Sequence, residues 1–295
     1  MELSVVIPAF NEERGIGATL DELKAVLKSM AGSSEIILVD DGSSDRTAAI
    51  ALAKGVKVIS HSTNRGYGAA LAAGFSAAKG RVLACLDADG TYPPSELPKL
   101  YAALRKSGAE MVVGSRMAGK NEGMPLLRKF GNRILSNFAS FMLGVRVSDL
   151  SSGMRVLPKE TLQKLLPLSH ELDFTVNMTL EAASQKMLVV EVPIDYRHRA
   201  GESKLSASRH GLMFLKSIIR VVRDYEPLRL FLPISGFFVL VGVLGMLQLL
   251  ARRLGGEQST SITNGLIVTG ALVLFGLQIF FFGIIADMIA SRNKK

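Results

Sequence analysis

The chain has 295 residues, a length that suits one large domain or one domain with an appendage. Its hydrophobic share of 48% is high for a soluble enzyme while its charged share of 21% is ordinary, so we expect a soluble part joined to a membrane part. A single cysteine, Cys85, excludes an internal disulfide, and no spacing of cysteine and histidine matches a structural zinc site.

Positive charge is concentrated in the C-terminal third of the chain. Residues 1–196 carry 22 Lys and Arg against 21 Asp and Glu, whereas residues 197–295 carry 13 against 5. A nucleic-acid-binding protein more often carries a basic stripe on its folded domain. The distribution therefore argues against nucleic acid as a partner and predicts a membrane surface, or an anionic substrate close to one.

Short β-rich runs alternate with helical patterns from the N-terminus onward. Ile16, Leu20, Leu23 and Leu27 recur at helical spacing between the first two runs. The predicted strands, in chain order, are Leu3–Ile7, Glu35–Val39, Val56–Ser60, Val82–Leu86 and Met111–Gly114. This alternation predicts an α/β fold with a Rossmann-like, mostly parallel sheet and helices on both faces.

The end of the globular domain is harder to place, because residues 116–170 are less regular. After them, Thr175–Ser184 has the pattern of a helix and Leu188–Val192 that of a strand. We therefore expect the globular domain to occupy residues 1–200 and to close near Asp195.

Two apolar runs follow the globular domain. Leu230–Leu250 and Gly265–Ile285 each contain 21 residues without Asp, Glu, Lys or Arg. Each is long enough to cross a hydrocarbon core of about 30 Å. We expect two transmembrane helices within residues 228–290, at about 230–250 and 265–286, in preference to two buried core helices. The glycines in these runs would allow close contacts within one hairpin or between chains, so the sequence is compatible with both a monomer and a homo-oligomer.

Basic residues flanking the two runs predict their orientation. Arg252 and Arg253 lie between the runs, whereas a larger set lies outside them: Arg209, Lys216, Arg220, Arg223, Arg229, Arg292, Lys294 and Lys295. The chain opens directly on a predicted strand, without a signal segment. We therefore expect a multi-pass protein of the cytoplasmic membrane whose globular domain, both termini and basic tail (residues 291–295) are cytoplasmic.

Residues 201–227 predict an amphipathic helix in the cytoplasmic headgroup layer. Apolar residues recur there at helical spacing and interleave with basic ones: Leu205, Leu212, Leu215, Ile219 and Val222 with Lys204, Arg209, Lys216, Arg220 and Arg223. The alternative is a helix that packs on the globular domain and keeps its basic face in water.

Polar clusters follow three of the predicted strands, where an open α/β sheet binds its ligands. They are Pro8-Ala9-Phe10-Asn11-Glu12, Asp40-Asp41-Gly42-Ser43 and Asp87-Ala88-Asp89. Asp87 and Asp89 are hard oxygen ligands that can hold Mg²⁺ or Mn²⁺ together with phosphate oxygens. The Gly66-Tyr67-Gly68 segment does not predict a dinucleotide site, because Leu71 occupies the third small position and the segment follows the third strand.

These clusters, together with Asn64-Arg65-Gly66, resemble the nucleotide-sugar half of the family 2 glycosyltransferases of the GT-A fold. Later motifs resemble the branch that makes polyprenyl-phosphate sugars, to which dolichyl-phosphate mannose synthase belongs. They are Gly114-Ser115-Arg116, Arg128, Ser152-Gly153-Met154-Arg155 and Arg199-Ala200-Gly201-Glu202-Ser203-Lys204-Leu205. The resemblance covers residues 3 to about 205 and implies a GT-A domain there, which the interface helix and the transmembrane hairpin predicted above follow in the chain.

The resemblance also implies roles for individual residues. The residues implied to bind the nucleotide sugar are Pro8, Ala9, Asn11, Glu12, Asp40, Asp41, Gly66, Asp87 and Ala88. The residues implied to bind the metal are Asp87 and Asp89. The residues implied to bind the acceptor phosphate are Ser115, Arg116, Arg128, Arg199, Ser203 and Lys204. The implied catalytic residues are Asp89, Arg116, Arg128, Arg199 and Lys204. Thr91 stands where some relatives have a further metal-binding Gln, and the pattern around Glu171-Leu172-Asp173-Phe174 argues against assuming that the sugar is mannose.

A physical argument favours a phosphate acceptor independently of the family. A sugar hydroxyl needs a general base to become a nucleophile, whereas a phosphate monoester with a second pKa near 6 is already largely anionic at neutral pH. Such a site needs cations, and Arg197, Arg199 and Lys204 lie just before or at the start of the predicted interface helix. We therefore expect metal-dependent, inverting transfer of one sugar from a UDP- or GDP-sugar to undecaprenyl or dolichyl phosphate.

Two other functions compete with this prediction. A family 2 transferase that extends a polysaccharide would usually carry a Gln-x-x-Arg-Trp motif and more spans, but this chain has no Trp. A non-catalytic membrane scaffold on the same fold would not need the intact acidic and basic residues named above.

Overall fold

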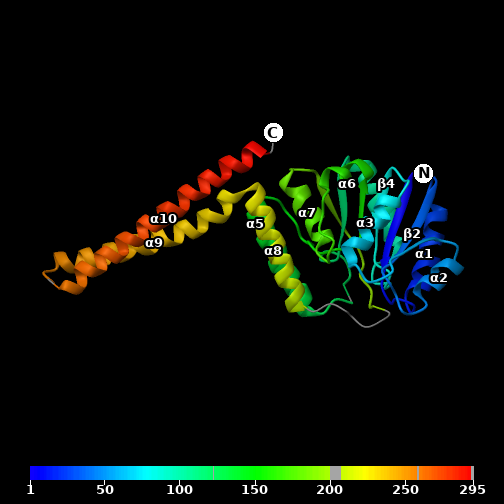
Figure 1. Cartoon of the computed structure of the whole chain (residues 1–295), viewed down its shortest axis with the longest axis horizontal. Coiled ribbons are helices and arrows are strands. Elements are labelled where there is room, and N and C mark those ends of the chain that lie inside the picture. The colour runs from blue at the N-terminus through cyan, green and yellow to red at the C-terminus, as the bar shows by residue number, and fades with distance from the viewer. Residues whose placement is uncertain (122, 200–206, 258, 294–295) are drawn as a thin grey trace. The chain divides into compact units, whose positions relative to one another are not determined.

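The computed structural model describes residues 1–121, 123–199, 207–257 and 259–293. It divides into two compact units, Met1–Ile218 and Ile219–Lys295, which are described separately (Figure 1).

The first unit is built on a seven-stranded sheet with the order β3-β2-β1-β4-β6-β5-β7. The strands are β1 (Leu3–Ala9), β2 (Ser34–Asp40), β3 (Lys57–Ser60), β4 (Val82–Cys85), β5 (Met111–Ser115), β6 (Arg155–Pro158) and β7 (Val189–Pro193). All neighbours pair in parallel except β6, which runs antiparallel to both β4 and β5. The carboxyl ends of β1, β2 and β4 therefore meet at one edge of the sheet.

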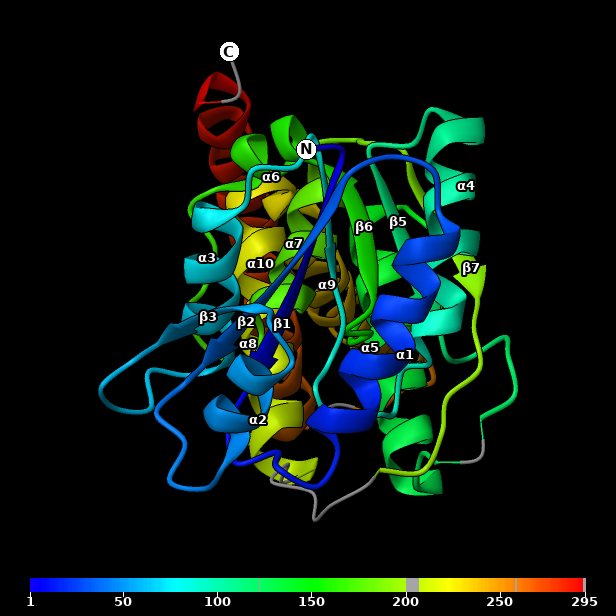
Figure 2. The same ribbon diagram turned by 90° about the vertical axis from the view of Figure 1, so that its right-hand side faces the viewer.

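Helices cover both faces of this sheet, as Figure 2 shows for α1 and α4 on one face and α3 and α7 on the other. The helices are α1 (Ile16–Ser29), α2 (Thr47–Ala53), α3 (Tyr67–Ala77), α4 (Leu97–Ser107), α5 (Leu126–Leu143), α6 (Lys159–Leu165), α7 (Phe174–Ser184) and α8 (Ala207–Tyr225). A 3₁₀ turn, η1 (Pro94–Glu96), precedes α4. The predicted α/β fold with a mostly parallel sheet is thus confirmed.

Alternation along the central strands explains why the sheet has two cores. Val5 and Ile7 of β1 pack in the same core as Leu20 of α1, whereas Val6, between them, packs in the other core with Phe75 of α3. Both faces of β1 are therefore apolar, as expected for a strand covered on two sides. This packing fixes the strand ends from which the site is built.

The predicted strands all form, with ends shifted by one or two residues. The irregular region 116–170 contains three elements that the sequence did not predict, the long helix α5, the short antiparallel strand β6 and the short helix α6. β6 has four residues and begins with Arg155, so it shows little alternation. The first compact unit also extends past Asp195 to Ile218, because Ser217 and Ile218 of α8 are buried.

Helix α5 has an unusual apolar face. It buries Ala139 and Met142, but it also leaves large apolar side chains exposed at helical spacing: Leu126, Leu127, Phe130, Ile134 and Phe141. Exposed apolar stripes of this kind mark surfaces that bind a protein or a membrane.

The second unit contains α9 (Pro227–Leu254) and α10 (Thr260–Asn293), which pack against each other along their length. Both have the length and composition of membrane-spanning helices, with mean hydropathies of 2.4 and 2.3. Glycines permit their close approach, since a Cβ at Gly276 would lie 2.9 Å from the carbonyl oxygen of Ser235. The predicted spans lie inside these two helices.

The predicted amphipathic helix corresponds to α8. Within its described residues, the basic side chains of Lys216 and Arg220 are exposed, as are the apolar side chains of Leu212 and Ile219. Leu205 and Lys204, which the prediction included, lie outside the described residues.

Candidate active site

The three polar clusters predicted from the strand ends come together at one edge of the sheet. β1 pairs with β2 so that Ala9 lies opposite Asp40, and β1 also pairs with β4, after which Asp87 and Asp89 follow. The positions that the sequence separates by tens of residues are therefore neighbours in the fold.

Two cavities open at this edge. The first, of about 220 Å³, is the strand-end cavity, lined by Pro8, Ala9, Phe10, Glu12, Asp41, Asn64, Gly66, Ala70 and Ala88. The second, of about 310 Å³, is the basic cavity, whose lining includes Tyr92, Arg116, Met124, Leu127, Arg128, Asn132, Leu135, Ser151, Gly153, Tyr196, His210 and Phe214. Both cavities are also lined by Tyr67, Asp87, Asp89, Leu172 and Arg199. The two carboxylates thus lie where the cavities meet.

Asp87 lies at this junction and is partly buried. Its Oδ1 accepts a hydrogen bond of 3.0 Å from the hydroxyl of Tyr67, at the N-terminus of α3. Burial, together with the charge of Asp89, raises the pKa of the Asp87 carboxyl to about 7, against the lowering effect of the Tyr67 hydrogen bond and of Arg116 and Arg199. An added positive charge beside Asp87 would therefore stabilise its ionised form.

Asp89 is fixed on both of its oxygens. Its Oδ1 accepts bonds from the backbone nitrogen of Thr91, at 3.0 Å, and from the Thr91 hydroxyl, at 2.6 Å. Its Oδ2 lies 3.2 Å from a guanidinium nitrogen of Arg199, which also pairs with Glu12. Thr91, where some relatives have Gln, thus orients a carboxylate in this protein.

A divalent cation fits these residues. No group of three or more potential metal-binding side chains occurs among the described residues, so the protein offers the pair Asp87 and Asp89. Mg²⁺ and Mn²⁺ are commonly held by one or two carboxylates together with substrate phosphates and water. The buried Asp89 and the partly buried Asp87, whose pKa is raised, lie at the edge of an open cavity and match that requirement.

Asp41 shapes the strand-end cavity with both carboxylate oxygens. Oδ1 lies 2.6 Å from Nδ1 of His61 and accepts the backbone nitrogen of Arg65 at 2.9 Å, while Oδ2 accepts that of Gly66 at 2.8 Å. Gly66 has a φ of +99°, which favours glycine there. The carboxylate of Asp41 therefore holds the loop that leads into α3.

Asn11 and Asp40 differ from the other residues predicted to bind the nucleotide sugar, because neither lines the strand-end cavity. Asn11, with a φ of +52°, accepts the backbone nitrogen of Ser44 at 2.8 Å on its Oδ1. Asp40 is buried and accepts a backbone bond from Ser43 at 3.3 Å. Both residues brace the loops behind the cavity in this structure.

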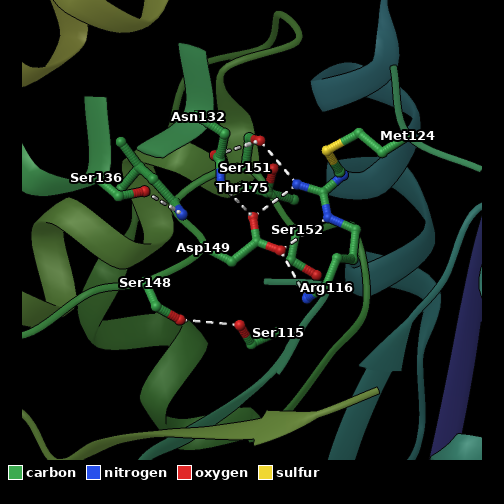
Figure 3. Close-up of polar contacts among 12 residues, drawn as sticks. Ser115, Arg116, Met124, Asn132, Ser136, Ser148, Asp149, Ser151, Ser152 and Thr175 are labelled. Carbon is green, nitrogen blue, oxygen red and sulfur yellow. Dashed lines mark hydrogen bonds and ion pairs between the residues drawn. The ribbon is translucent and has the colours of Figure 1, made fainter. Parts of the chain in front are cut away.

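Arg116 lies in the wall of the basic cavity as half of a buried ion pair (Figure 3). Its side chain meets Asp149 through two bonds, of 2.8 and 2.6 Å, and its Nη2 also donates to Ser151 at 2.9 Å. Its guanidinium carbon lies 5.9 and 5.4 Å from the ring centres of Tyr92 and Tyr196. Arg116 is therefore held in one position before any ligand arrives.

The charges of this pair stabilise each other despite burial. Burial alone would raise the pKa of the Asp149 carboxyl, but the Arg116 guanidinium holds it below its usual value. Asn132 of α5 also joins the pair: it donates a hydrogen bond of 3.1 Å to Asp149 and accepts one of 2.9 Å from Ser151 (Figure 3). The network joins the end of β5, helix α5 and the loop before β6.

The loop that carries Asp149 also touches the carboxylate junction. A Cβ at Gly153 would lie 2.9 Å from both oxygens of Asp87, so this position requires glycine. Below the loop, the fully buried Arg155 donates to the carbonyls of Ser152 and Leu150 at 3.1 and 3.2 Å. One loop thus positions the cavity's arginine and lies against a carboxylate of the junction.

The remaining residues predicted for the acceptor phosphate separate into three groups. Arg128 and Arg199 line the basic cavity. Ser115 is buried, lies 2.9 Å from the hydroxyl of Ser148 and lines neither cavity. Ser203 and Lys204 lie outside the described residues.

Sequence reasoning missed several lining residues, among them Asn132, Leu172, Tyr196, His210 and Phe214. None lies in a polar cluster after a strand. The Asp-x-x-x-x-Met-Arg spacing of residues 149–155 would have been a signal for Asp149, since it lies just before the quoted Ser152-Gly153-Met154-Arg155 motif.

Comparison with known sequences gives the family. Residues 4–166 match glycosyl transferase family 2, and residues 226–291 match the GtrB C-terminal hairpin. The chain belongs to glycosyl transferase family 2. The predicted resemblance and the predicted enzyme class are therefore confirmed, and the apolar helices α9 and α10 correspond to the matched hairpin.

Relatives of this family 2 transferase extend the comparison. The chain is 37% identical to the dolichyl-phosphate hexose transferase of Haloferax volcanii, over 78% of this chain and 97% of the relative. It is 31% identical to the undecaprenyl-phosphate 4-deoxy-4-formamido-L-arabinose transferase of Pseudomonas aeruginosa, over 97% of this chain and 84% of the relative. These matches confirm the predicted polyprenyl-phosphate branch.

A solved structure with a similar fold is glucosyl-3-phosphoglycerate synthase from Mycobacterium tuberculosis, in complex with Mn²⁺, uridine diphosphate and glucosyl-3-phosphoglycerate. The TM-score is 0.58 and the identity 23%, over 74% of this chain and 79% of the other. This likeness supports the GT-A fold.

Proposed function

We propose that this chain transfers one sugar from a nucleotide diphosphate sugar to a polyprenyl phosphate, with inversion at the anomeric carbon, at the cytoplasmic face of a membrane. The observation that carries the proposal is the meeting of two unlike cavities at Asp87 and Asp89. The strand-end cavity suits a nucleotide, and the basic cavity, with its arginines and apolar side chains, suits a lipid phosphate.

In the proposed reaction, an oxygen of the acceptor phosphate attacks the anomeric carbon of the donor. The new bond joins that oxygen to the sugar, the bond from the sugar to the β-phosphate breaks, and the nucleoside diphosphate leaves with the electron pair. Since the acceptor is already anionic, no side chain has to remove a proton from it. Direct attack from the opposite side inverts the configuration.

The chain's own residues supply position and charge. Arg116, fixed by Asp149, and Arg128 would hold the acceptor phosphate, and Arg199 would lie between the acceptor and the leaving diphosphate. Asp87 and Asp89 would hold Mg²⁺ or Mn²⁺, which supplies positive charge to the leaving diphosphate when bound. Lys204 and Ser203 remain proposed acceptor contacts from the sequence motif.

Apolar surface supports a lipid acceptor and a membrane location. The apolar side chains of Leu127 and Leu135 of α5 and of Phe214 of α8 line the basic cavity together with its arginines. The exposed apolar stripe of α5 is flanked by exposed Lys129 and Arg133, a combination that suits an anionic membrane surface. The named relatives use dolichyl or undecaprenyl phosphate, and the excess of basic residues outside the hairpin favours a cytoplasmic domain.

The test is a transfer assay on the purified full chain in detergent, with Mg²⁺ or Mn²⁺, a short-chain polyprenyl phosphate and a panel of labelled UDP- and GDP-sugars. We expect one donor to give label in the organic phase, dependent on the metal and released by mild acid. Label that appears on added saccharides but never in the organic phase would contradict the lipid acceptor. The donor that works names both the sugar and the base.

A further inference from the structure

A short turn before α7, residues 169–173, touches elements on both sides of the site. Asp173, at its end, is 4% exposed and accepts hydrogen bonds on both carboxylate oxygens. One comes from Ser169 in the same turn, and the other, of 2.5 Å, comes from Ser217 of α8. Asp173 immediately precedes α7 but makes no side-chain capping bond to it. Its carboxylate therefore binds Ser217 of α8 and does not cap the start of α7.

The bond from Ser217 holds the segment of α8 that lines the basic cavity. His210, Gly211 and Phe214 of α8 face that cavity, and Ser217 follows Phe214 by three residues, on the same side of the helix. Ser217 is 1% exposed. Its hydroxyl also lies 3.2 Å from the carbonyl of Met213, but the shorter, charge-assisted bond to Asp173 is the stronger of the two.

The other side of the same turn lies against the N-terminus of α3. The carbonyl of His170 accepts the backbone nitrogen of Ala69 at 2.9 Å. A Cβ at Gly68 would lie 2.5 Å from the carbonyl of Glu171, so the two segments are in close contact. Tyr67, the first residue of α3, donates to Asp87, and Leu172 of the turn lines both cavities.

We propose that Asp173 and Ser217 are positioning residues that hold the cavity-lining part of α8 against the 169–173 turn. Because the same turn contacts the N-terminus of α3 beside the donor site, this pair couples the shape of the acceptor site to that of the donor site. A continuous path of contacts runs from Asp87 through Tyr67, the α3 N-terminus and the turn to α8. The inference rests on the proposed function, since it assigns the basic cavity to the acceptor. It adds a residue pair that touches neither substrate.

The kinetic test compares Ser217→Ala with wild type in the full chain. Losing a buried hydrogen bond to a carboxylate should raise the KM for a short-chain polyprenyl phosphate by about tenfold, while the donor KM stays within about twofold. Ser217→Thr keeps the hydroxyl and should restore the acceptor KM. An acceptor KM that does not change in Ser217→Ala, or both KM values rising together with a fall in kcat, would overturn the proposal.

Ser184→Ala is the matched control. Ser184 is a buried serine of α7 whose hydroxyl bonds to the carbonyl of Glu181 in the same helix, at 2.9 Å. Its removal deletes a buried hydroxyl without releasing one element from another, so both KM values should equal those of wild type. The acceptor KM of Asp173→Asn should lie between those of wild type and Ser217→Ala, because the amide oxygen of the new side chain still accepts the hydrogen bond from Ser217.

Amide hydrogen exchange tests the attachment without any transfer. In Ser217→Ala, deuterium uptake over residues 207–218 should rise, whereas Ser184→Ala should match wild type. Adding Mn²⁺ with UDP or GDP, whichever binds, should lower that uptake in wild type and leave it high in Ser217→Ala. Equal uptake in wild type and Ser217→Ala would overturn the proposal, even if wild type transfers sugar to lipid. Absence of transfer by wild type alongside the expected exchange pattern would contradict the proposed function and leave the attachment standing.

Discussion

The strand-end cavity and the basic cavity share Asp87 and Asp89 but are constructed differently. Most of the strand-end cavity is lined by residues at or soon after the ends of β1 to β4, and backbone nitrogens bonded to side chains, such as the Asp41 carboxylate, hold its loops. Most of the basic cavity is lined by helices and loops from residues 116–214, joined by side-chain contacts such as Arg116 with Asp149.

This difference predicts how substitutions in each cavity should affect the protein. A parallel sheet fixes the strand-end cavity, so single changes there should remove chemistry and leave the fold intact. The basic cavity depends on a buried ion pair and on helix docking, so changes there should affect stability and acceptor binding together.

The largest expected effect is at the junction. Asp89→Asn removes the negative charge that faces Arg199 and the proposed cation, and turnover should fall by about a thousandfold while the circular dichroism spectrum is unchanged. Asp21→Asn, at an exposed ion pair with Lys54, is the matched control and should keep full turnover. Activity of Asp89→Asn close to wild type would remove this carboxylate from the reaction.

Asp149→Asn tests the basic cavity's dependence on its ion pair. It leaves Arg116 buried without its full partner, and the free energy of unfolding should drop by about 3–5 kcal/mol in thermal or chemical denaturation. Since the folded pKa of Asp149 lies below its unfolded value of about 3.9, this stabilisation is present above about pH 4 and is lost as the pH falls further. A variant as stable as wild type at neutral pH would show that the pair is not needed for the fold.

Arg128→Ala separates acceptor binding from donor binding. Arg128 lines the basic cavity, so the KM for polyprenyl phosphate should rise by about tenfold with the donor KM little changed. Arg133→Ala, an exposed arginine on the same helix, is the control for lost surface charge. Lys204→Ala should resemble Arg128→Ala, and an unaltered acceptor KM would take either residue out of the acceptor site.

The smallest expected effect lies at the rim of the loops behind the strand-end cavity. Arg46 and Glu13 form an ion pair of 3.5 Å in which the arginine side chain is 83% exposed. Arg46→Ala should change the free energy of unfolding by less than about 0.5 kcal/mol and leave both KM values as in wild type. A change in donor KM would extend the strand-end site to this rim.

The same contrast explains what could be predicted from the sequence. Short apolar strands with polar residues just after them indicate the sheet and its edge directly, so Asp87, Asp89 and much of the lining of the strand-end cavity follow from periodicity and position. Leu172, which lines that cavity from the turn before α7, does not. Asn11 and Asp40 show the limit of that rule. Position after a strand brings a side chain to the edge, but local hydrogen bonds to Ser44 and Ser43 decide whether it lines a cavity.

The basic cavity could be predicted only through family motifs. Arg116 and Asp149 are 33 residues apart, and no local pattern reports such a pairing. The resemblance implies Ser115 at the acceptor phosphate; in this structure its hydroxyl lies 2.9 Å from that of Ser148, and Ser115 lines neither cavity. Asp173 and Ser217 escape sequence reasoning for the same reason, since docking of a helix on a turn leaves no periodic signal.

The most direct test of the two-cavity account is an experimental structure of the full chain with Mn²⁺, the nucleoside diphosphate of its donor and a short-chain polyprenyl phosphate. We predict Mn²⁺ bound by Asp87 and Asp89, the nucleotide in the strand-end cavity, and the lipid phosphate in the basic cavity beside Arg116 and Arg128. A nucleotide bound among those arginines, or a lipid phosphate outside the basic cavity, would contradict the account.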